Sequence, residues 1–163
     1  MKLEEGSIPI YGKVTTIERN PVTHEVVSVR VDKNILTYLS RNEICKWLAN
    51  SGSPKAAGAW NYMAIGYGET AAAADQTTLV SELTRQVSVL SVETDSVTSQ
   101  DIIFQSTTTF TATESANYNT IWEIALLDAD TAGDMFNRVK LSVARDNYNN
   151  DLEVIYQATF NST

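Results

Sequence analysis

Two adjoining stretches near the start of the chain have the residue pattern of β-strands, and the second of them alternates apolar and polar residues. Residues 8–19 are mostly apolar or β-branched, and residues 25–31 place three valines on one face with Ser28 and Arg30 on the other. Alternation with a period of two is typical of β-strands, because successive side chains point to opposite faces. The Asn20-Pro21 pair between the stretches is a turn signal. The pattern therefore predicts an antiparallel hairpin.

Two segments have the spacing of a helix instead. Residues 40–43 (Ser-Arg-Asn-Glu) form a capping box, in which the first and fourth side chains bond backbone N–H groups at the helix start. Apolar residues follow at helical spacing until Asn50-Ser51-Gly52, a usual helix end. This predicts a helix over residues 41–50. A second short helix is expected over residues 75–84, with Asp75 as its N-cap.

The remaining pattern is that of strands separated by short turns. Residues 60–65 are apolar on both faces, so this strand is expected to be central and buried. Further strands are expected over residues 86–93, 102–113, 121–127, 135–145 and 152–160. Thr107, Thr109 and Thr111 share one face, which suits an exposed or subunit-facing sheet surface. The chain is therefore predicted to be mainly β, an antiparallel β-sandwich or barrel with two short helices.

Length and composition favour one folded unit. The chain has 163 residues, of which 43% are hydrophobic, the size of one ordinary domain. We expect residues 11–163 to form a single β-rich domain and residues 1–10 to form an N-terminal arm. No apolar run approaches the roughly 18 residues that a membrane span needs, and the N-terminal residues do not resemble a secretory signal.

The charge narrows the class of partner. The formal net charge is −8 and the sequence pI is about 4.6. Nucleic-acid backbones and anionic lipids attract clustered Lys and Arg, so we expect neither nucleic acid nor membrane as a partner. Cys45 is the single cysteine, which rules out an internal disulfide and indicates folding in a reducing cytoplasm.

Catalytic and cofactor sites have few residues to draw on. His24 is the one histidine and lies beside a predicted turn, and Cys45 lies in a predicted helix, where a buried thiol is usual. Gly66-Tyr67-Gly68 follows a strand, but it lacks the third glycine and the Lys-Ser/Thr pair of nucleotide-binding turns. We therefore expect no catalytic residue, no cofactor and no metal site.

The acidic segment of residues 128–134 has a calcium-binding alternative. It shares the acids at positions 1 and 3 and the glycine at position 6 with a calcium loop. Ala132 stands at position 5 and Val139 at position 12, where oxygen ligands are needed. We interpret the segment as an acidic hairpin turn, with weak Ca²⁺ binding as the alternative.

Glu123 is the carboxylate that needs an explanation, because it lies inside the apolar run of residues 121–127. A buried charge must be paired, and Arg85 and Arg138 are the natural candidates. The hypothesis is a structural ion pair that fixes strand register or a subunit contact. A catalytic acid is the alternative, but no second carboxylate has a similarly apolar setting.

The aromatic residues divide into two groups. Trp47, Trp60 and Trp122 fall in predicted elements and are interpreted as core residues instead of a sugar-stacking platform. Tyr118 and Tyr148 fall in predicted turns, where they are placed for contacts with a partner.

Several segments, taken in order, resemble a pattern of tailed-bacteriophage virion proteins. Residues 62–70 (YMAIGYGET) resemble an AIGTGTT strand and turn, and residues 78–85 (TLVSELTR) resemble the TAL-x-x-E-x-x-R segment that follows it. Four later segments also match in order. Residues 110–113 (FTAT) resemble an F-T-A-T strand, and residues 121–128 (IWEIALLD) resemble the strand I-x-E-I-G-L-F. Residues 135–138 (MFNR) resemble M-F-A-R, and residues 156–160 resemble the closing strand. With residues 34–48, the resemblance covers residues 34–160. Tyr67 replaces the usual Thr and Ala125 the usual Gly.

The resemblance implies a non-enzymatic virion component of β-tulip-like sandwich or barrel fold, assembled in the host cytoplasm. The first hypothesis is a capsid decoration (cement) protein that binds the major capsid protein as a homotrimer and stabilises the head shell. The alternative is a tail, baseplate or fibre-base adaptor. A small hydrolase or carbohydrate-binding module is a third hypothesis, which needs a carboxylate pair or an exposed aromatic platform.

The interaction residues expected for such a component lie in three places. They are Lys2, Leu3, Ile8 and Ile10 in the arm, the Thr107/Thr109/Thr111 face, and Tyr118 and Tyr148 in the turns.

Overall fold

The computed structural model describes residues 10–38, 44, 60–94, 102–112, 120–146 and 149–160. One sheet consists of β1 (Ile10–Arg19), β2 (Val26–Lys33), β6 (Val89–Thr94), β7 (Ile102–Phe110) and β10 (Asp151–Phe160). The other consists of β3 (Ile35–Leu36), β4 (Tyr62–Gly66), β5 (Glu82–Val87), β8 (Ile121–Leu127) and β9 (Met135–Arg145). We call them the first and the second sheet.

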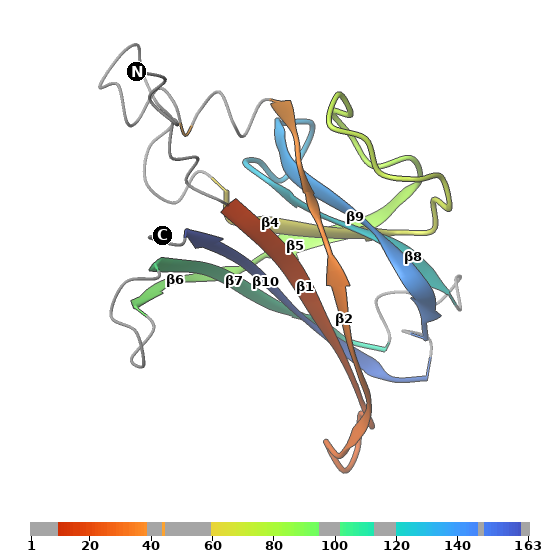
Figure 1. Cartoon of the computed structure of the whole chain (residues 1–163). Coiled ribbons are helices and arrows are strands. Elements are labelled where there is room, and N and C mark those ends of the chain that lie inside the picture. The colour runs from red at the N-terminus through yellow and green to blue at the C-terminus, as the bar shows by residue number, and fades with distance from the viewer. Residues whose placement is uncertain are drawn as a thin grey trace, which may run out of the picture.

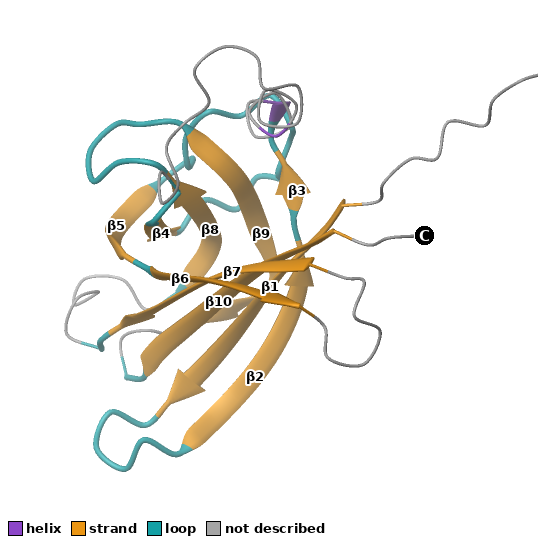
Figure 2. Ribbon diagram, turned by 90° about the vertical axis from the view of Figure 1, so that its left-hand side faces the viewer, coloured by secondary structure: helices purple, strands orange, loops and turns teal. Residues whose placement is uncertain are grey.

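The two antiparallel sheets pack as a sandwich (Figure 1; Figure 2). The strand order is β2-β1-β10-β7-β6 in the first sheet and β3-β9-β8-β4-β5 in the second. The hairpin predicted around Asn20-Pro21 is β1 and β2, and the predicted bounds of β8 and β9 are those observed. The mainly β sandwich fold is thus confirmed.

The outermost strands of the sequence are neighbours in space. β1 and β10 pair antiparallel along ten residues each, from Ile10 opposite Phe160 to Arg19 opposite Asp151. The two ends of the described chain therefore meet at the same end of two neighbouring inner strands of the first sheet (Figure 1).

The core between the sheets is built around aromatic rings. The ring centroid of Phe136 lies 5.1 Å from that of Trp60, 6.3 Å from that of Phe104 and 6.1 Å from that of Tyr156. The first two pairs are tilted and the pair with Tyr156 is edge-to-face, and such ring contacts add to the burial of apolar area. Inward side chains of both sheets surround this group, among them Val14, Phe110, Leu126 and Leu141. Trp60 is accordingly a core residue, as the sequence predicts.

Tyr156 brings a phenol into this core, and its hydroxyl is fully buried beside the side chain of Asn34. Burial raises the pKa of the phenol, whereas the unfolded chain ionises near its ordinary pKa of about 10. Above that pH only the unfolded state releases this proton, so stability falls as pH rises.

We therefore expect the free energy of unfolding of Tyr156→Phe to lie within about 1 kcal/mol of that of the parent at neutral pH. From about pH 10 upward the variant should lose less stability than the parent. Urea unfolding at neutral and alkaline pH checks this. An equal loss of unfolding free energy in parent and variant above about pH 10 would contradict it.

The helix predicted over residues 75–84 is wrong. Residues 76–81 form an irregular loop, and β5 begins at Glu82. The backbone N–H groups of Val80 and Ser81 donate to the side chain of Glu123 instead of to carbonyls of a preceding helical turn. Leu79 packs on Ala125 and neighbouring residues, so the apolar spacing arises from the loop covering the second sheet.

The single strand predicted over residues 86–93 is also wrong. It is two strands, β5 and β6, which belong to different sheets. The break is at Ser88, whose N–H donates to the carbonyl of Asn61 at 2.7 Å and whose hydroxyl accepts a hydrogen bond from Ser106. Both strands are extended, so alternation alone does not show that the chain changes sheets between them.

Two other predicted segments lie outside the described residues. These are the helix over residues 41–50, apart from Ile44, and the arm over residues 1–10, apart from Ile10 at the start of β1.

Candidate interaction site

A fully buried ion pair lies on the face of the second sheet that points away from the core. Glu123 on β8 and Arg138 on β9 are 0% and 1% exposed, and Arg138 Nε donates to Glu123 Oε2 at 2.8 Å. Two charges removed from water are stable only when their remaining donors and acceptors are also satisfied. The surrounding loop supplies those partners.

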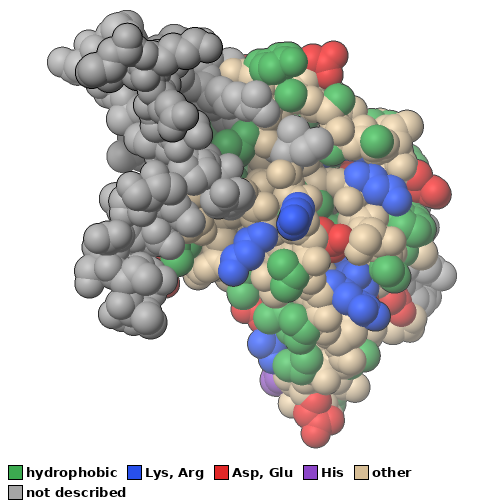
Figure 3. All heavy atoms as spheres, in the orientation of Figure 1, with side chains coloured by type: hydrophobic (Ala, Val, Ile, Leu, Met, Phe, Trp, Pro, Cys, Tyr) green, Lys and Arg blue, Asp and Glu red, His purple; other side chains and the backbone are tan. Residues whose placement is uncertain are grey.

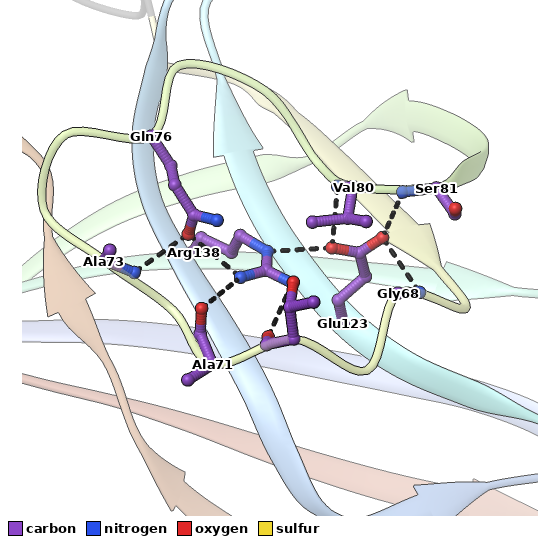
Figure 4. A network of polar contacts seen from close by, with 9 residues as sticks. Gly68, Ala71, Ala73, Gln76, Val80, Ser81, Glu123 and Arg138 are labelled. Carbon is purple, nitrogen blue, oxygen red and sulfur yellow. Dashed lines mark hydrogen bonds and ion pairs between the residues drawn. The ribbon is translucent and has the colours of Figure 1, made fainter.

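The carboxylate of Glu123 binds backbone N–H groups of the loop between β4 and β5 (Figure 4). Its Oε1 accepts from Gly68 at 3.0 Å and from Ser81 at 2.7 Å, and its Oε2 accepts from Val80 at 3.0 Å. Gly68 and Val80 lie at opposite ends of the loop. One side chain therefore fixes both ends.

The guanidinium of Arg138 binds the middle of the same loop. Its Nη1 donates to the carbonyl of Ala71 at 3.1 Å and to Gln76 Oε1 at 2.9 Å, and its Nη2 donates to the carbonyl of Thr70 at 3.0 Å. Gln76 Oε1 also accepts from the N–H of Ala73 at 2.8 Å. We call residues 67–81 the anchored loop, because these bonds hold it on the sheet while much of its outer side is exposed.

The anchored loop also explains the Gly-x-Gly turn. A Cβ at Gly68 would lie 2.5 Å from Glu123 Oε1 and 2.6 Å from Val80 Cβ. Glycine is therefore needed here because the loop comes close to the carboxylate of Glu123. Its N–H is bound to that carboxylate, so it does not point at a phosphate as in a nucleotide-binding turn.

Gly68→Ala is expected to lower the free energy of unfolding by about 1–3 kcal/mol, because the added methyl group pushes the loop off Glu123. Ala71→Ser, at an exposed position of the same loop, should change it by less than about 0.5 kcal/mol. Urea unfolding of both variants tests the difference, and equal losses would contradict the account.

Arg85 has a partner other than Glu123. It forms an ion pair with Glu82, three residues before it, at 2.6 Å. Its Nη1 also donates to the carbonyl of Ala129 at 2.7 Å and to that of Ala132 at 2.9 Å. Of the two candidate arginines, Arg138 is the one that the structure places against Glu123.

The acidic turn is closed by its own hydrogen bonds. Asp128 Oδ1 accepts from the N–H of Asp134 at 2.6 Å, and Gly133 adopts a φ of 82° beside it. Arg85 occupies two carbonyls of this turn and brings a positive charge that opposes a bound cation. Among the described residues, no group of three or more His, Cys, Asp or Glu is arranged to hold a metal ion.

The remaining candidates fall in scattered places. His24 is an exposed turn residue with a φ of 58°. The prediction of Trp122 as a core residue is wrong, because its ring is only partly buried and faces the ammonium of Lys140 at 4.5 Å from the ring centroid. Thr109 and Thr111 are exposed and Thr107 is partly buried, all at β7 or just beyond it. The candidates outside the described residues are Lys2, Leu3, Ile8, Cys45, Trp47, Tyr118 and Tyr148.

A second buried polar group, absent from the sequence prediction, joins the two sheets. Glu18 Oε1 accepts from the N–H of Asp146, and Asp32 Oδ1 accepts from the N–H of Ser142, both at 2.9 Å. Arg145 is 3% exposed; burial lowers its pKa, and the charges of Glu18 and Asp32 oppose that shift. We call Glu18, Asp32 and Arg145 the polar seam. Its sequence signal is that Glu18 falls on the same strand face as Val14 and Thr16.

Comparison with known proteins gives one match. Residues 34–161 match the family model described as "Podophage GP4 fiber I protein gp80". No curated protein and no solved structure matches the chain. In the described part of the chain, no helix is long and apolar enough to cross a membrane.

Proposed function

The chain belongs to the podophage GP4 fiber I protein gp80 family, and from this premise we propose that it is an adaptor module at the base of a tail fibre. The family makes the chain a non-enzymatic structural component of the phage virion, related to its fibres. The adaptor role, the position at the fibre base and the partners are our proposal.

The family match favours the tail and fibre alternative over the capsid decoration hypothesis, because the family description names a fibre. A neighbouring tail protein accordingly replaces the major capsid protein as the partner that we propose. The hydrolase hypothesis is set aside because the family is one of non-enzymatic structural proteins. Trp60 is buried in the core, which leaves it no role in a sugar-stacking platform.

The observation that carries the adaptor proposal is the anchored loop. Binding costs free energy when loops must be ordered at the interface, and a loop held before binding avoids that cost. Here Glu123 and Arg138 hold the loop through three backbone N–H groups and two carbonyls. Tyr67 and Val80, 41% and 49% exposed, give its outer side apolar area for a partner.

The shape of the described part also favours an adaptor over a fibre shaft. A shaft is built from repeated extended segments or heptads. The ten strands described here instead pack as two sheets around shared apolar clusters. Such a sandwich offers several faces for neighbours.

The arm at residues 1–10 is proposed as a second attachment to a neighbouring tail protein. Lys2, Leu3, Ile8 and Ile10 combine charged and apolar side chains in a short stretch. Replacement of residues 2–9 by a Gly/Ser stretch should reduce incorporation of the protein into particles. Unchanged incorporation would remove the arm from the proposal.

The experiment that tests the placement is electron microscopy of virions labelled with gold-conjugated antibody against this protein. Mass spectrometry of purified particles serves as the control for its presence. Label confined to the tail at the fibre base supports the adaptor role. Label spread over the head overturns it in favour of decoration, and label along the whole fibre overturns it in favour of a shaft.

A further inference from the structure

The outer face of the first sheet carries a row of β-branched side chains across all five strands. The outer face is the one that points away from the second sheet. Strand register places Val31 opposite Thr15, Thr15 opposite Ile155, Ile155 opposite Thr107, and Thr107 opposite Val89. The row thus reads Val-Thr-Ile-Thr-Val from β2 to β6, and it is the same in both directions.

This face is open at the two ends of the row, and its apolar side chains lie among threonines and charged residues. Val31 and Val89, at the two ends of the row, are 60% and 76% exposed, and Val29 beside Val31 is 52% exposed. Hydrophobic and basic side chains lie next to each other on the surface over β2 (Figure 3). The methyl groups of these β-branched side chains offer apolar contact area to a partner.

We propose that the outer face pairs with the same face of a second copy of this chain, around a two-fold axis that runs along β10 through Ile155. An isologous interface requires a surface that is complementary to itself. Under this axis Val31 meets Val89, Thr15 meets Thr107, and Ile155 meets Ile155. The palindromic row fulfils that requirement.

The charges beside the row favour this axis. Lys13 and Lys33 lie directly opposite each other on β1 and β2, which is unfavourable unless an anion joins them. A hollow of about 310 Å³ lies there, lined by Gly12, Lys13, Val31, Lys33 and Thr159. The axis along β10 places Ser91 of the second copy opposite Lys33, because β6 then lies over β2. Glu93 of the second copy is the next outward residue along β6, within the reach of a lysine side chain at this hollow.

Other orientations of the same face are less favourable. A two-fold axis across the strands would place Lys13 and Lys33 over Ile17 and Val29 and bury the ammonium groups against apolar side chains. Glu153 lies near the proposed axis and would meet its own copy, but Arg19 neutralises it within each chain at 2.9 Å.

The available area is that of an ordinary dimer interface. Five strands spaced about 4.8 Å apart and up to ten residues long span on the order of 800 Å², close to the area per partner in standard interfaces. The row contains no Trp, Tyr or Arg, the residues that dominate binding energy in most interfaces. The expected dimer is therefore of micromolar affinity. It does not depend on the adaptor role.

The test is analytical ultracentrifugation of the purified full chain over a range of concentrations. The parent is expected to form a dimer, and Ile155→Lys and Ile155→Glu should each weaken it at least tenfold by setting like charges together on the axis. A mixture of the two variants should restore dimerisation, because Lys then meets Glu. Val143→Lys, at a 48% exposed valine on β9, is the matched control and should dimerise like the parent.

A second pair of variants tests the direction of the axis. Lys33→Glu and Glu93→Lys should each weaken the dimer, and the double variant should regain it. A monomer at all concentrations, a trimer, or a dimer insensitive to charges at Ile155 would overturn the proposal. Circular dichroism of each variant separates loss of pairing from loss of folding.

Discussion

Replacing Arg138 by methionine is expected to lower the free energy of unfolding by about 3–5 kcal/mol. The substitution leaves Glu123 as an uncompensated charge at 0% exposure and removes the donors bound to Thr70, Ala71 and Gln76. The carboxylate retains only its backbone donors. Urea unfolding measures the loss, and hydrogen exchange should show the amides of the anchored loop exposed.

The matched control is Arg85→Met. Arg85 also binds a carboxylate and two backbone carbonyls, which belong to the acidic turn. Its partner Glu82 is exposed and can be solvated. The expected loss is about 1–2 kcal/mol. Equal losses in the two variants would contradict the distinction between buried and exposed pairs.

The double variant Glu123→Leu/Arg138→Met separates the ion pair from the loop that it holds. It should be less destabilised than the sum of the two single variants, because no charge is left unpaired. It should still be less stable than the parent, because the N–H groups of Gly68, Val80 and Ser81 lose their acceptor. Exact additivity would show that Glu123 and Arg138 act independently.

Replacing Arg145 by methionine is expected to lower the free energy of unfolding by about 2 kcal/mol. Arg145 is 3% exposed in the polar seam, and its loss removes the positive charge that acts on Glu18 and Asp32 through space. Both carboxylates lie on the first sheet and accept hydrogen bonds from β9 and the turn after it. Their repulsion should loosen the two sheets at this end, so amides of β2 should exchange faster with solvent.

Arg30→Met is the control for the polar seam. Arg30 lies on β2 near Arg145 but is exposed, and its loss should change stability by less than about 1 kcal/mol. If Arg145→Met lost no more than Arg30→Met, the polar seam would have no role in joining the sheets.

Local pattern predicts strands well where one face is buried. The bounds of β8 are readable because its residues are apolar apart from Glu123, and the Asp-rich turn separates it from β9. The charge within β8 is also readable, since a carboxylate in such a run needs a cation. Which arginine supplies it depends on register, and Arg138 pairs with Ala125, next to Glu123 on the same strand face.

Other features depend on contacts between segments far apart in the sequence. Residues 75–84 have helical spacing, but the N–H groups of Val80 and Ser81 bind a side chain 42 or more residues away. Ser88 divides an alternating run because its partners Asn61 and Ser106 belong to different segments. The palindromic row appears only when five strands are placed in register, so no single strand displays it.

The pairing of β1 with β10 determines how the chain would respond to mechanical force. Tension applied at residues 10 and 160 would act on one end of the β1–β10 ladder, where Ile10 and Phe160 are paired. It would open this ladder one hydrogen-bonded pair at a time. The second sheet lies outside this path. In the proposed adaptor role, contacts with neighbouring subunits that engage many bonds together would resist force better than tension along the covalent chain.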